Sequence, residues 1–420
     1  MVSPDDLTTT RLQIHNRMFA PKINALPMGL NGNAVLPPGA NIKQPEKPPT
    51  PPEVQLTRIV HYNADHSGCG LWRMSWPAHL LNFHNKAMVT ESTVMILDPK
   101  WYANVKAIRV QRQATTSQKL FVQHLKEIQK TVGFRLIYEI DDVVFREDIP
   151  DYNKFKSAFI SDEIRNNTTE IINMCDEVTV TCNFMRDLYR ERTGKQEITV
   201  IPNFPPRFWM GNYFDERRVS MNYDKHKKRP RILYAGSGAH FDVENRTGQR
   251  DDFEHVNKVI IDTRFKYRWV FIGAFPPTLH PYIQKGDIEF HPWQKLYDYP
   301  KKIHDLEIQM SVAPLQDNNF NRAKSDLKYV EACCYGLPVA CQDLCTYEDA
   351  EIKFKTGEEM IECIDRELSK AGRYKNQAIQ RRKVAEDRFL EHDRNLDCYL
   401  ELYQHPYRSD KRVNLKRYNP

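Results

Sequence analysis

The segment FNRAKSDLKYVEACCYGLPVACQD, from Phe320 to Asp343, is the most informative part of this sequence. Its first part has apolar residues at helical spacing, and a Gly-Leu-Pro turn then leads into a short apolar run that is typical of a buried strand. We expect one helix here, with Lys324 and Lys328 in its first turns. The N-terminus of a helix already carries partial positive charge, so cations are disfavoured there. The two lysines therefore need an explanation other than helix stability.

One stripe of this predicted helix carries Lys324, Lys328 and Glu331, away from the apolar stripe that we expect to face the core. A solvated face with a Lys328–Glu331 salt bridge would explain the pairing of these side chains but not their position. A bound diphosphate explains both, because backbone N–H groups, the helix dipole and two ammonium groups would then meet one anion. Glu331, one turn deeper, can accept hydrogen bonds from a ribose diol. The segment therefore predicts a nucleotide-binding site.

The composition is that of a globular protein, with 40% hydrophobic and 11% aromatic residues among 420. This length is enough for two or three domains, each with its own core. The sequence has no signal-peptide core and no apolar run of the roughly 20 residues that cross a bilayer, so we expect a cytoplasmic protein without a membrane span. Its nine cysteines include no pair spaced by two residues, which favours reduced thiols over disulfides or a metal site.

Strands and helices alternate along the chain, which favours an α/β fold of parallel sheets with helices on both faces. The predicted strands lie at 56–63, 92–97, 107–111, 135–140, 177–181, 197–203, 231–238, 267–275, 286–291 and 307–315, and the main predicted helices at 118–131, 163–174 and 376–404. From this rhythm we predict a mobile Pro-rich arm (1–55), a first Rossmann-like domain (56–205), a basic linker (206–230), a second Rossmann-like domain (231–375), and C-terminal helices with a basic tail (376–420). A cleft between the two domains is the expected ligand site.

FNRAKSDLKYVEACCYGLPVA also resembles the donor-binding motif of retaining GT-B glycosyltransferases of the family 4 type. In that family a helix carries a ribose-binding glutamate just before a Gly-x-Pro-Val strand. The likeness extends to LIYEIDDVVF and to EVTVTCNFMRDLY with ITVIPNF, and it covers most of residues 57–404. Glu331 matches the second glutamate of the family motif, whereas the first falls at Ala323, so the pattern is incomplete here. The resemblance implies a GT-B fold: two Rossmann-like parallel-sheet domains facing a cleft, with C-terminal helices packing back on the first domain.

The same resemblance implies that a sugar moves from a nucleotide-sugar donor, with a UDP-sugar as the expected donor, to a hydroxyl acceptor with retention of configuration. No cofactor and no metal would be needed, since the helix N-terminus and lysines stabilise the leaving diphosphate, which can itself take the acceptor proton. Two alternatives remain open. One is a non-catalytic nucleotide- or nucleic-acid-binding protein of this fold, which Ala323 favours. The other is an epimerase of the same fold, which would convert the donor with no acceptor present.

One glycine turn follows the first strand of each half, and in this context both turns resemble family loops. The residues that the resemblance assigns to them are Gly236, Ser237 and Gly238 for the donor phosphates, and Gly68, Gly70 and Arg73 for the phosphates or the acceptor across the cleft. Family members commonly have an arginine and a lysine a few residues after the donor-phosphate loop, and Arg246 is a candidate for that arginine. The alternative is a pair of tight turns that need glycine only for its backbone freedom.

Polar residues at the predicted strand ends complete the candidate site. Asp141 and Asp142 end the strand YEIDD, and one of them would be the catalytic carboxylate that hydrogen-bonds the acceptor hydroxyl. Adjacent residues of a strand point to opposite faces, so we expect at most one of the two to face the ligand; the alternative role is a turn or helix cap. The segment DIEFHPW resembles the one that flanks the donor base, with His291 as a polar contact, although an ordinary loop histidine is the alternative.

For the acceptor, the most specific expectation is DNA bearing hydroxymethylated pyrimidines, as in phage base-modifying glycosyltransferases. Basic clusters lie at 225–231 and 408–420, and both are expected near the mouth of the cleft. The Gly-Cys-Gly turn at 68–70 also resembles that of the phage α-glucosyltransferase acting on such DNA. Double-stranded DNA would then be a partner, in the host cytoplasm if the protein is phage-encoded. The competing acceptor is a saccharide of a cell-surface polymer.

Overall fold

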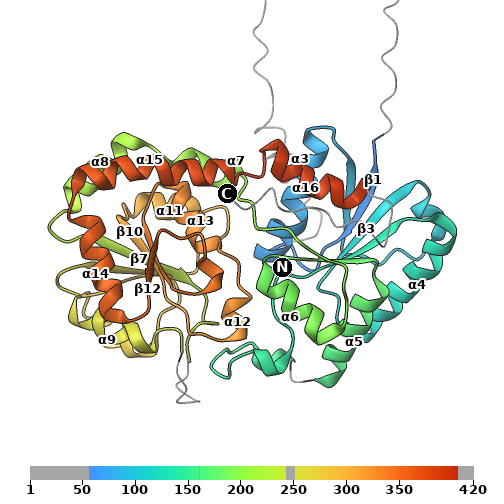
Figure 1. Ribbon diagram of the computed structural model, residues 1–420, viewed down its shortest axis with the longest axis horizontal. Helices are drawn as coiled ribbons and strands as arrows, with labels where there is room; N and C mark the ends of the chain where they lie inside the picture. The colour runs from blue at the N-terminus through green and yellow to red at the C-terminus, as the bar shows by residue number, and fades with distance from the viewer. Residues whose placement is uncertain (1–55, 160, 243–250, 405–420) are drawn as a thin grey trace, which may run out of the picture. The chain divides into compact units, whose positions relative to one another are not determined.

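The computed structural model describes residues 56–159, 161–242 and 251–404, and these residues build two six-stranded parallel sheets (Figure 1). The first sheet consists of β1 (Arg58–Tyr62), β2 (Met88–Ser92), β3 (Val105–Gln111), β4 (Arg135–Glu139), β5 (Glu177–Val180) and β6 (Ile198–Val200). The second consists of β7 (Arg231–Gly236), β8 (Arg268–Gly273), β9 (Glu289–Pro292), β10 (Met310–Ala313), β11 (Val339–Gln342) and β12 (Ile352–Phe354). The predicted α/β fold with two parallel sheets is confirmed.

The strand order in each sheet reverses beside its first strand. The orders are β2-β1-β3-β4-β5-β6 and β12-β11-β10-β7-β8-β9. In an open parallel sheet such a reversal leaves a crevice at the carboxyl ends of the strands, and ligands bind there. The topology therefore directs attention to the loops after β1 and β3 in the first half, and to those after β7 and β10 in the second.

Helices cover the faces of both sheets. The helices before the second sheet are α2 (Gly68–Gly70), α3 (Trp76–Phe83), α4 (Thr116–Val132), α5 (Asp162–Met174), α6 (Asn183–Thr193), α7 (Arg207–Met210) and α8 (Glu216–His226). The later ones are α9 (Glu254–Asp262), α10 (His280–Gln284), α11 (Tyr299–Asp305), α12 (Asn319–Arg322), α13 (Leu327–Cys334), α14 (Gly357–Leu368), α15 (Ala371–Asp387) and α16 (Asp393–Gln404). No helix in these three described stretches is long and apolar enough to cross a membrane.

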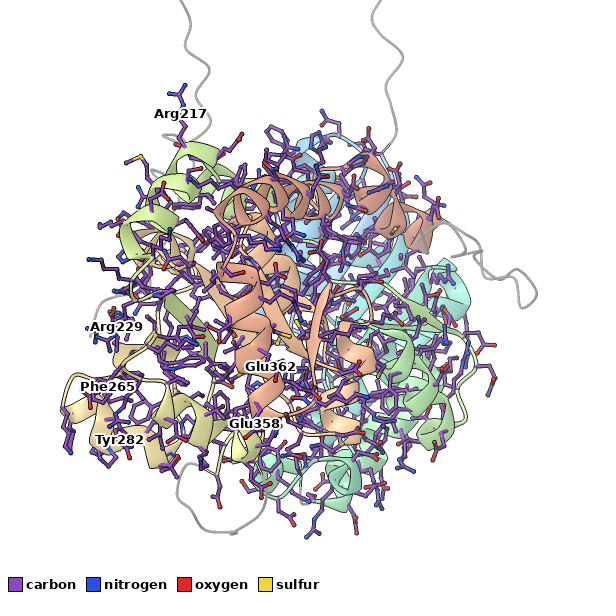
Figure 2. All side chains as sticks on the ribbon, turned by 60° about the vertical axis from the view of Figure 1, so that its left-hand side comes forward. Arg217, Arg229, Phe265, Tyr282, Glu358 and Glu362 are labelled. Atoms are coloured by element: carbon purple, nitrogen blue, oxygen red, sulfur yellow. The ribbon has the colours of Figure 1, made fainter. Side chains whose placement is uncertain are left out.

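Local sequence explains how individual helices begin and which face they bury. A capping box starts α4, in which the Thr115 side chain accepts from Gln118 N and the Gln118 side chain accepts from Thr115 N; left-handed Gly133 ends the helix. On α14, Glu358 and Glu362 project outward (Figure 2), whereas the apolar side chains of the opposite face are buried against the second sheet. This alternation of faces is the periodicity that the sequence predicts.

The two C-terminal helices pack on different halves of the protein. Helix α15 lies beside α8 and α13, whereas α16 lies beside α3 and β3 (Figure 1). The prediction that C-terminal helices pack back on the first domain is thus confirmed, and α16 is the helix that does so.

A buried ion network lies beneath α16. Glu139, at the end of β4, accepts hydrogen bonds from Arg73, Arg109 and Thr179, and none of the four side chains reaches solvent. Tyr403 of α16 covers this network and hydrogen-bonds Arg109 at 3.4 Å. Although burial opposes ionisation, Arg109 and Arg73 hold the pKa of Glu139 below its ordinary value.

Two strand predictions differ from the structure. The strand expected at 92–97 is wrong: β2 lies before it and ends at Ser92, where the Ser92 hydroxyl hydrogen-bonds both polar backbone groups of Val94 and turns the chain. In the apolar run that suggested this strand, Val94 is 70% exposed and Leu97 60% exposed, whereas Met95 and Ile96 pack against the hydrophobic cluster of the first sheet. The short strand β12 was not predicted, because three residues are too few to show a period.

Candidate functional site

The helix expected across residues 320–334 is interrupted, and α12 and α13 take its place. The prediction of one continuous helix is therefore wrong. Asp326, the residue directly before α13, is held by an ion pair of 3.0 Å with Arg388, which comes from the C-terminal part of the chain. Lys324 consequently lies between the two helices, whereas Lys328 is the second residue of α13.

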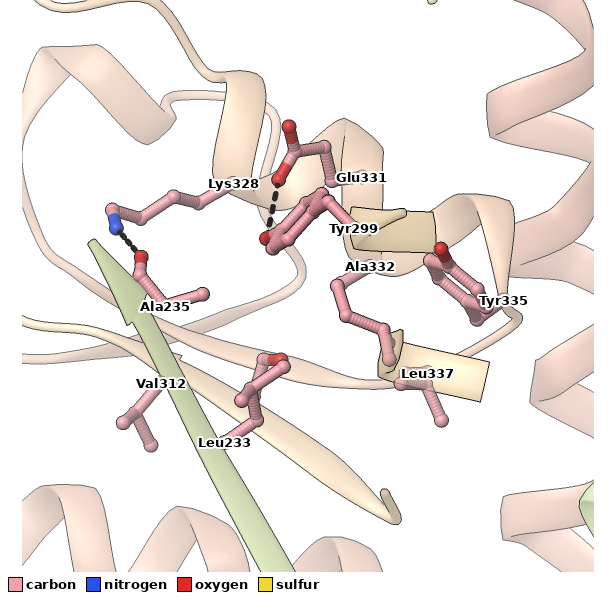
Figure 3. A pocket seen from close by; sticks show the side chains of 11 residues that line it. Leu233, Ala235, Tyr299, Val312, Lys328, Glu331, Ala332, Tyr335 and Leu337 are labelled. Carbon is pink, nitrogen blue, oxygen red and sulfur yellow. Dashed lines mark hydrogen bonds between the residues drawn. The ribbon is translucent and has the colours of Figure 1, made fainter. Parts of the chain in front are cut away.

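Lys328 extends from α13 to the carboxyl end of β7, where its Nζ donates a hydrogen bond to Ala235 O (Figure 3). The ammonium also lies 4.5 Å from the centre of the Tyr234 ring. Glu331, one turn further along α13, accepts a hydrogen bond of 3.2 Å from Tyr299 OH. Among the described residues Lys328 and Glu331 do not form the salt bridge considered as an alternative, because each side chain has a different partner.

A small pocket lies between these side chains and the sheet, lined on the sheet side by Leu233 and Val312 (Figure 3). Burial lowers the pKa of Lys328 from 10.5 to about 8, while the charge of Glu331 partly offsets this effect. Burial also raises the pKa of Glu331 from 4.5 to about 7. Both groups are therefore poorly solvated in their charged forms, and an anion next to Lys328 would restore part of the stabilisation that water no longer supplies.

The predicted donor-phosphate turn begins where β7 ends, directly after the carbonyl that Lys328 binds. Gly236 leaves room for the Tyr234 ring there, since a Cβ at this position would come within 2.5 Å of the Tyr234 hydroxyl. Ser237 and Gly238 continue the turn, and Gly238 is buried. The structure thus brings the three turn residues and Lys328 together.

His291 lies apart from this group. It is on β9, two strands from β7, so roughly 10 Å separates the two strands. Its Nε2 shares a hydrogen bond of 2.8 Å with Glu289, which also pairs with Arg231 at 2.8 Å. Arg246, the other candidate near the donor loop, lies outside the described residues.

Asp141 and Asp142 follow the end of β4, and Arg112 follows the end of its neighbour β3. Arg112 lies 3.6 Å from Asp141 and 3.8 Å from Asp142. Lys324, from the second half of the chain, pairs with Asp142 at 3.0 Å. The expectation that the two carboxylates point to opposite faces is wrong, because both lie beyond the strand, where its side-chain alternation no longer applies.

The pKa values of the two carboxyl groups are shifted in opposite directions. Burial raises the pKa of Asp141, whereas Lys324 and Arg112 lower the pKa of Asp142 although burial opposes them. Neighbouring carboxyl groups with opposite shifts are suited to different roles in proton transfer. Arg112 was not among the predicted site residues, although it directly follows the predicted strand at 107–111, at the edge of the sheet where ligands bind.

The first-half glycine turn is built around Asp65. Its carboxylate accepts from Ser67 N at 2.7 Å and from Gly70 N at 3.2 Å. A Cβ on Gly70 would lie 1.8 Å from Asp65 O, whereas a Cβ on Gly68 would meet nothing within 4 Å. Gly70 therefore has a structural requirement for glycine, whereas Gly68 has room for a side chain.

We expect Gly70→Ala to lower the free energy of unfolding by about 1–3 kcal/mol, because the added methyl group must displace backbone. Gly68→Ala is the matched control, two residues away in the same turn, and should leave stability within about 0.5 kcal/mol. Urea unfolding of both variants measures the difference. Equal losses would contradict the close approach of Asp65 to Gly70.

Arg73 requires a correction. It was expected to face donor phosphates or acceptor, but its side chain is completely buried. The guanidinium pairs with Glu139 at 2.6 Å and donates to Ile201 O at 2.6 Å and to Asn203 Oδ1 at 3.1 Å. Asn203 in turn donates to Ser325 Oγ at 3.0 Å, so Arg73 contributes to the support beneath the segment that leads into α13.

A second group of residues that the sequence did not indicate surrounds Asp252. Its buried carboxylate accepts hydrogen bonds from Tyr152 OH (2.8 Å), Asn321 Nδ2 (2.6 Å), Gln316 N (2.8 Å) and His240 Nδ1 (2.7 Å). Tyr152 comes from the first half of the chain and the others from the second. These partners are separated by up to 169 positions, so no local pattern could have linked them.

Ala323 occupies the position of the first family glutamate. It is 2% exposed and, with Phe320, belongs to the hydrophobic cluster of the first sheet. A charged side chain at this position would enter an apolar cluster, which explains the alanine. The residue next to it, Lys324, is the one that reaches the acidic pair.

Comparisons with known proteins give similarity at the level of structure alone. No protein-family model matches the sequence, and no curated protein matches it. HepE from Anabaena, solved with UDP and glucose, matches with a TM-score of 0.54 and 10% identity over 83% of this chain and 100% of that one. HepE with UDP-glucose matches with a TM-score of 0.53 and 10% identity over 83% of this chain and 99% of that one.

An α-glucosyltransferase solved with UDP and a 13-mer DNA containing an HMU base matches with a TM-score of 0.42 and 13% identity, over 83% of this chain and 95% of that one. This likeness is too weak to bear on the acceptor. The HepE matches, together with the two parallel sheets and the returning helix α16, show that this chain has the GT-B fold.

Proposed function

We propose that this protein is a glycosyltransferase that transfers a sugar from a UDP-sugar to a hydroxyl acceptor. The observation that carries this proposal is the position of Lys328, a poorly solvated cation at the start of α13 that reaches the end of β7 beside the glycine turn. A diphosphate at this place would receive backbone N–H groups and an ammonium group together. UDP-sugars are the first donors to test because HepE, which shares the fold, was solved with UDP-glucose.

The proposed chemistry follows the retaining family 4 pattern. The bond between the sugar C1 and the diphosphate oxygen breaks, a bond from C1 to the acceptor oxygen forms on the same face, and the acceptor proton passes to the leaving phosphate. Lys328 stabilises the negative charge that develops on that phosphate. Glu331 accepts hydrogen bonds from the ribose diol, a role that its ionised form serves.

On the acceptor side, we propose a neutral hydroxyl compound such as a saccharide. Asp141 and Asp142 pair with Arg112 and Lys324 at the end of the first sheet, so these four side chains carry no excess positive charge that would attract a polyanion. The basic residues Lys227 and Lys228 were expected near the ligand site, but they come shortly before β7 begins, at the edge opposite its glycine turn. The tail at 408–420 lies outside the described residues. Hydroxymethylated DNA is therefore the second acceptor to test.

A donor screen followed by acceptor analysis tests the function. UDP and a panel of UDP-sugars are tested for binding, and each bound donor is then incubated with saccharides, with hydroxymethylated duplex DNA and with plain duplex DNA. Mass analysis of a glycosylated saccharide supports the proposal, and sugar on the hydroxymethylated base would replace the saccharide by DNA. A donor converted without any acceptor would indicate an epimerase, and binding without product would indicate a nucleotide-binding protein.

We expect Asp141→Asn or Asp142→Asn, made one at a time, to reduce transfer by about 10²-fold or more while changing donor affinity little, because a carboxylate that positions the acceptor acts in the chemical step. The matched control is Asp162→Asn, an exposed carboxylate in the same half whose side chain is 81% accessible. Transfer rates and donor affinities are measured in parallel. Equal losses in both would place that carboxylate outside the acceptor site.

A further inference from the structure

His240 and Asp252 form a hydrogen-bonded pair that has no part in the mechanism described above. His240 follows the glycine turn after β7, and its Nδ1 lies 2.7 Å from Asp252 Oδ2. Only 12% of the His240 side chain is accessible, and that of Asp252 is fully buried. The hydrogen bond to Asp252 uses Nδ1, so it does not engage the second ring nitrogen of His240, Nε2.

Asp252 is fixed from several directions, which holds the imidazole in one orientation. Its other oxygen, Oδ1, accepts from Tyr152 OH, Asn321 Nδ2 and Gln316 N. The Asp252 carboxylate therefore cannot reorient when His240 gains another partner. A histidine held at Nδ1 by such a carboxylate presents Nε2 in a defined direction and can stabilise a proton there.

Charged groups from two segments of the second half influence the pKa of His240. Asp252 precedes α9, Lys328 is on α13, and Lys324 precedes α13. Burial lowers the pKa of His240 most, the two lysines lower it further, and Asp252 opposes them, so the imidazole is neutral near pH 7 in the free protein. An anion placed among these cations would reverse the balance, because it attracts the imidazolium while Asp252 already stabilises it.

We propose that His240 is a further contact for the diphosphate of the donor, and that the imidazole takes up a proton when the nucleotide binds. This inference rests on the proposed function, since it uses the same anion site beside Lys328. The bound anion would then meet a third cation, the imidazolium of His240, beside Lys324 and Lys328. Because His240 is neutral before the donor arrives, it adds no repulsion to the two lysines in the free protein. Glycine turn, lysines and histidine would together form one proton-linked site.

The test is the number of protons taken up per UDP bound, measured by titration calorimetry near pH 7 in two buffers that differ in ionisation enthalpy. We expect the wild-type protein to take up more protons than His240→Gln, by up to about one per UDP. The variant should also bind UDP about tenfold or more weakly, because a hydrogen bond to a charged group is lost. Protons exchanged by UDP itself, Lys328 and Glu331 are common to both proteins and cancel in the comparison.

His226→Gln is the matched control. His226 also pairs with a carboxylate, Glu307, at 2.7 Å, but it lies before β7 begins, at the edge of the second sheet opposite the glycine turn. This variant should retain the proton uptake of the wild-type protein. Histidine ring NMR of the wild-type protein, with and without UDP, gives an independent reading: one imidazole pKa must rise on binding, whether or not His240→Gln folds.

The outcomes separate the two proposals. If UDP binds and His240→Gln takes up as many protons as the wild-type protein, or if no imidazole pKa rises, the role of His240 is overturned while the glycosyltransferase proposal stands. If the wild-type protein binds no UDP, the UDP-sugar proposal fails and this inference fails with it.

Discussion

Replacing Glu139 by alanine is expected to lower the free energy of unfolding by about 3–5 kcal/mol, because it leaves buried guanidinium groups without their anion. Arg73 and Arg109 both pair with this carboxylate, and all three side chains have 0% accessibility. Neither arginine can reach water, and neither can lose its proton at any ordinary pH. Urea unfolding followed by circular dichroism measures the effect.

Glu127→Ala is the matched control for this prediction. Glu127 also pairs with a cation, Lys130, at 2.6 Å, but the two side chains are 67% and 69% accessible. Exposed pairs of this kind contribute only about 0–1 kcal/mol. If the two variants lost similar stability, the network around Glu139 would have little energetic role in the fold.

The same network predicts how stability depends on pH. The pKa of Glu139 is lower in the folded protein than its ordinary value of 4.5. The unfolded state therefore binds the proton more readily, and the stabilisation from Glu139 is present above pH 4.5 and is lost as the pH falls through the folded pKa. Glu139→Gln should show a smaller loss of stability on acidification than the wild-type protein.

Lys328→Met is expected to reduce kcat/KM for the UDP-sugar reaction by about 10²–10³-fold, because it removes a donor that stabilises charge on the leaving diphosphate. Stability should not fall, since an apolar chain of similar length replaces an ammonium whose charged form is disfavoured by burial. Steady-state kinetics and thermal unfolding measure the two effects. If Lys328→Met lost stability while its folded fraction bound the donor with normal affinity, Lys328 would have a structural role.

Two further results belong to this prediction. In the wild-type protein, kcat/KM should decline with rising pH well below the ordinary lysine pKa of 10.5, because burial lowers the pKa of Lys328 and the neutral amine no longer attracts the diphosphate. Lys301→Met is the matched control: Lys301 pairs with Asp305 on α11, and its side chain is 68% accessible. Its kinetics should match those of the wild-type protein.

Much of the fold was predictable because the relevant signals are local. Buried strands appear in the sequence as short apolar runs. Among the eleven strands that the structure forms in the described residues between 58 and 342, those at 107–111 and 135–140 are examples that were predicted. The spacing of Lys328 and Glu331, three residues apart on one helix, places them on the same side by helical geometry alone. Gly236 likewise marks the turn after β7 that the structure confirms.

The candidate site was less predictable because its groups are defined by distant partners. Arg73 looked like a ligand contact one turn after a glycine loop, yet Glu139 and Ile201 hold it in the interior. Asp141 and Asp142 were expected on opposite faces, yet Arg112 joins them. Each correction depends on a side chain from another element.

The sequence by itself determined the alternation of strands and helices, the turns that need glycine, and the helix that presents Lys328 and Glu331, because hydrophobic period and backbone preference are properties of neighbouring residues. Only the tertiary structure decided where the helix before Lys328 breaks, which cations pair with the acidic residues after β4, and that Asp252 orients His240. A charge removed from water is stabilised by whichever partner the fold brings to it. That partner can come from any position in the chain, so spacing along the sequence does not reveal it.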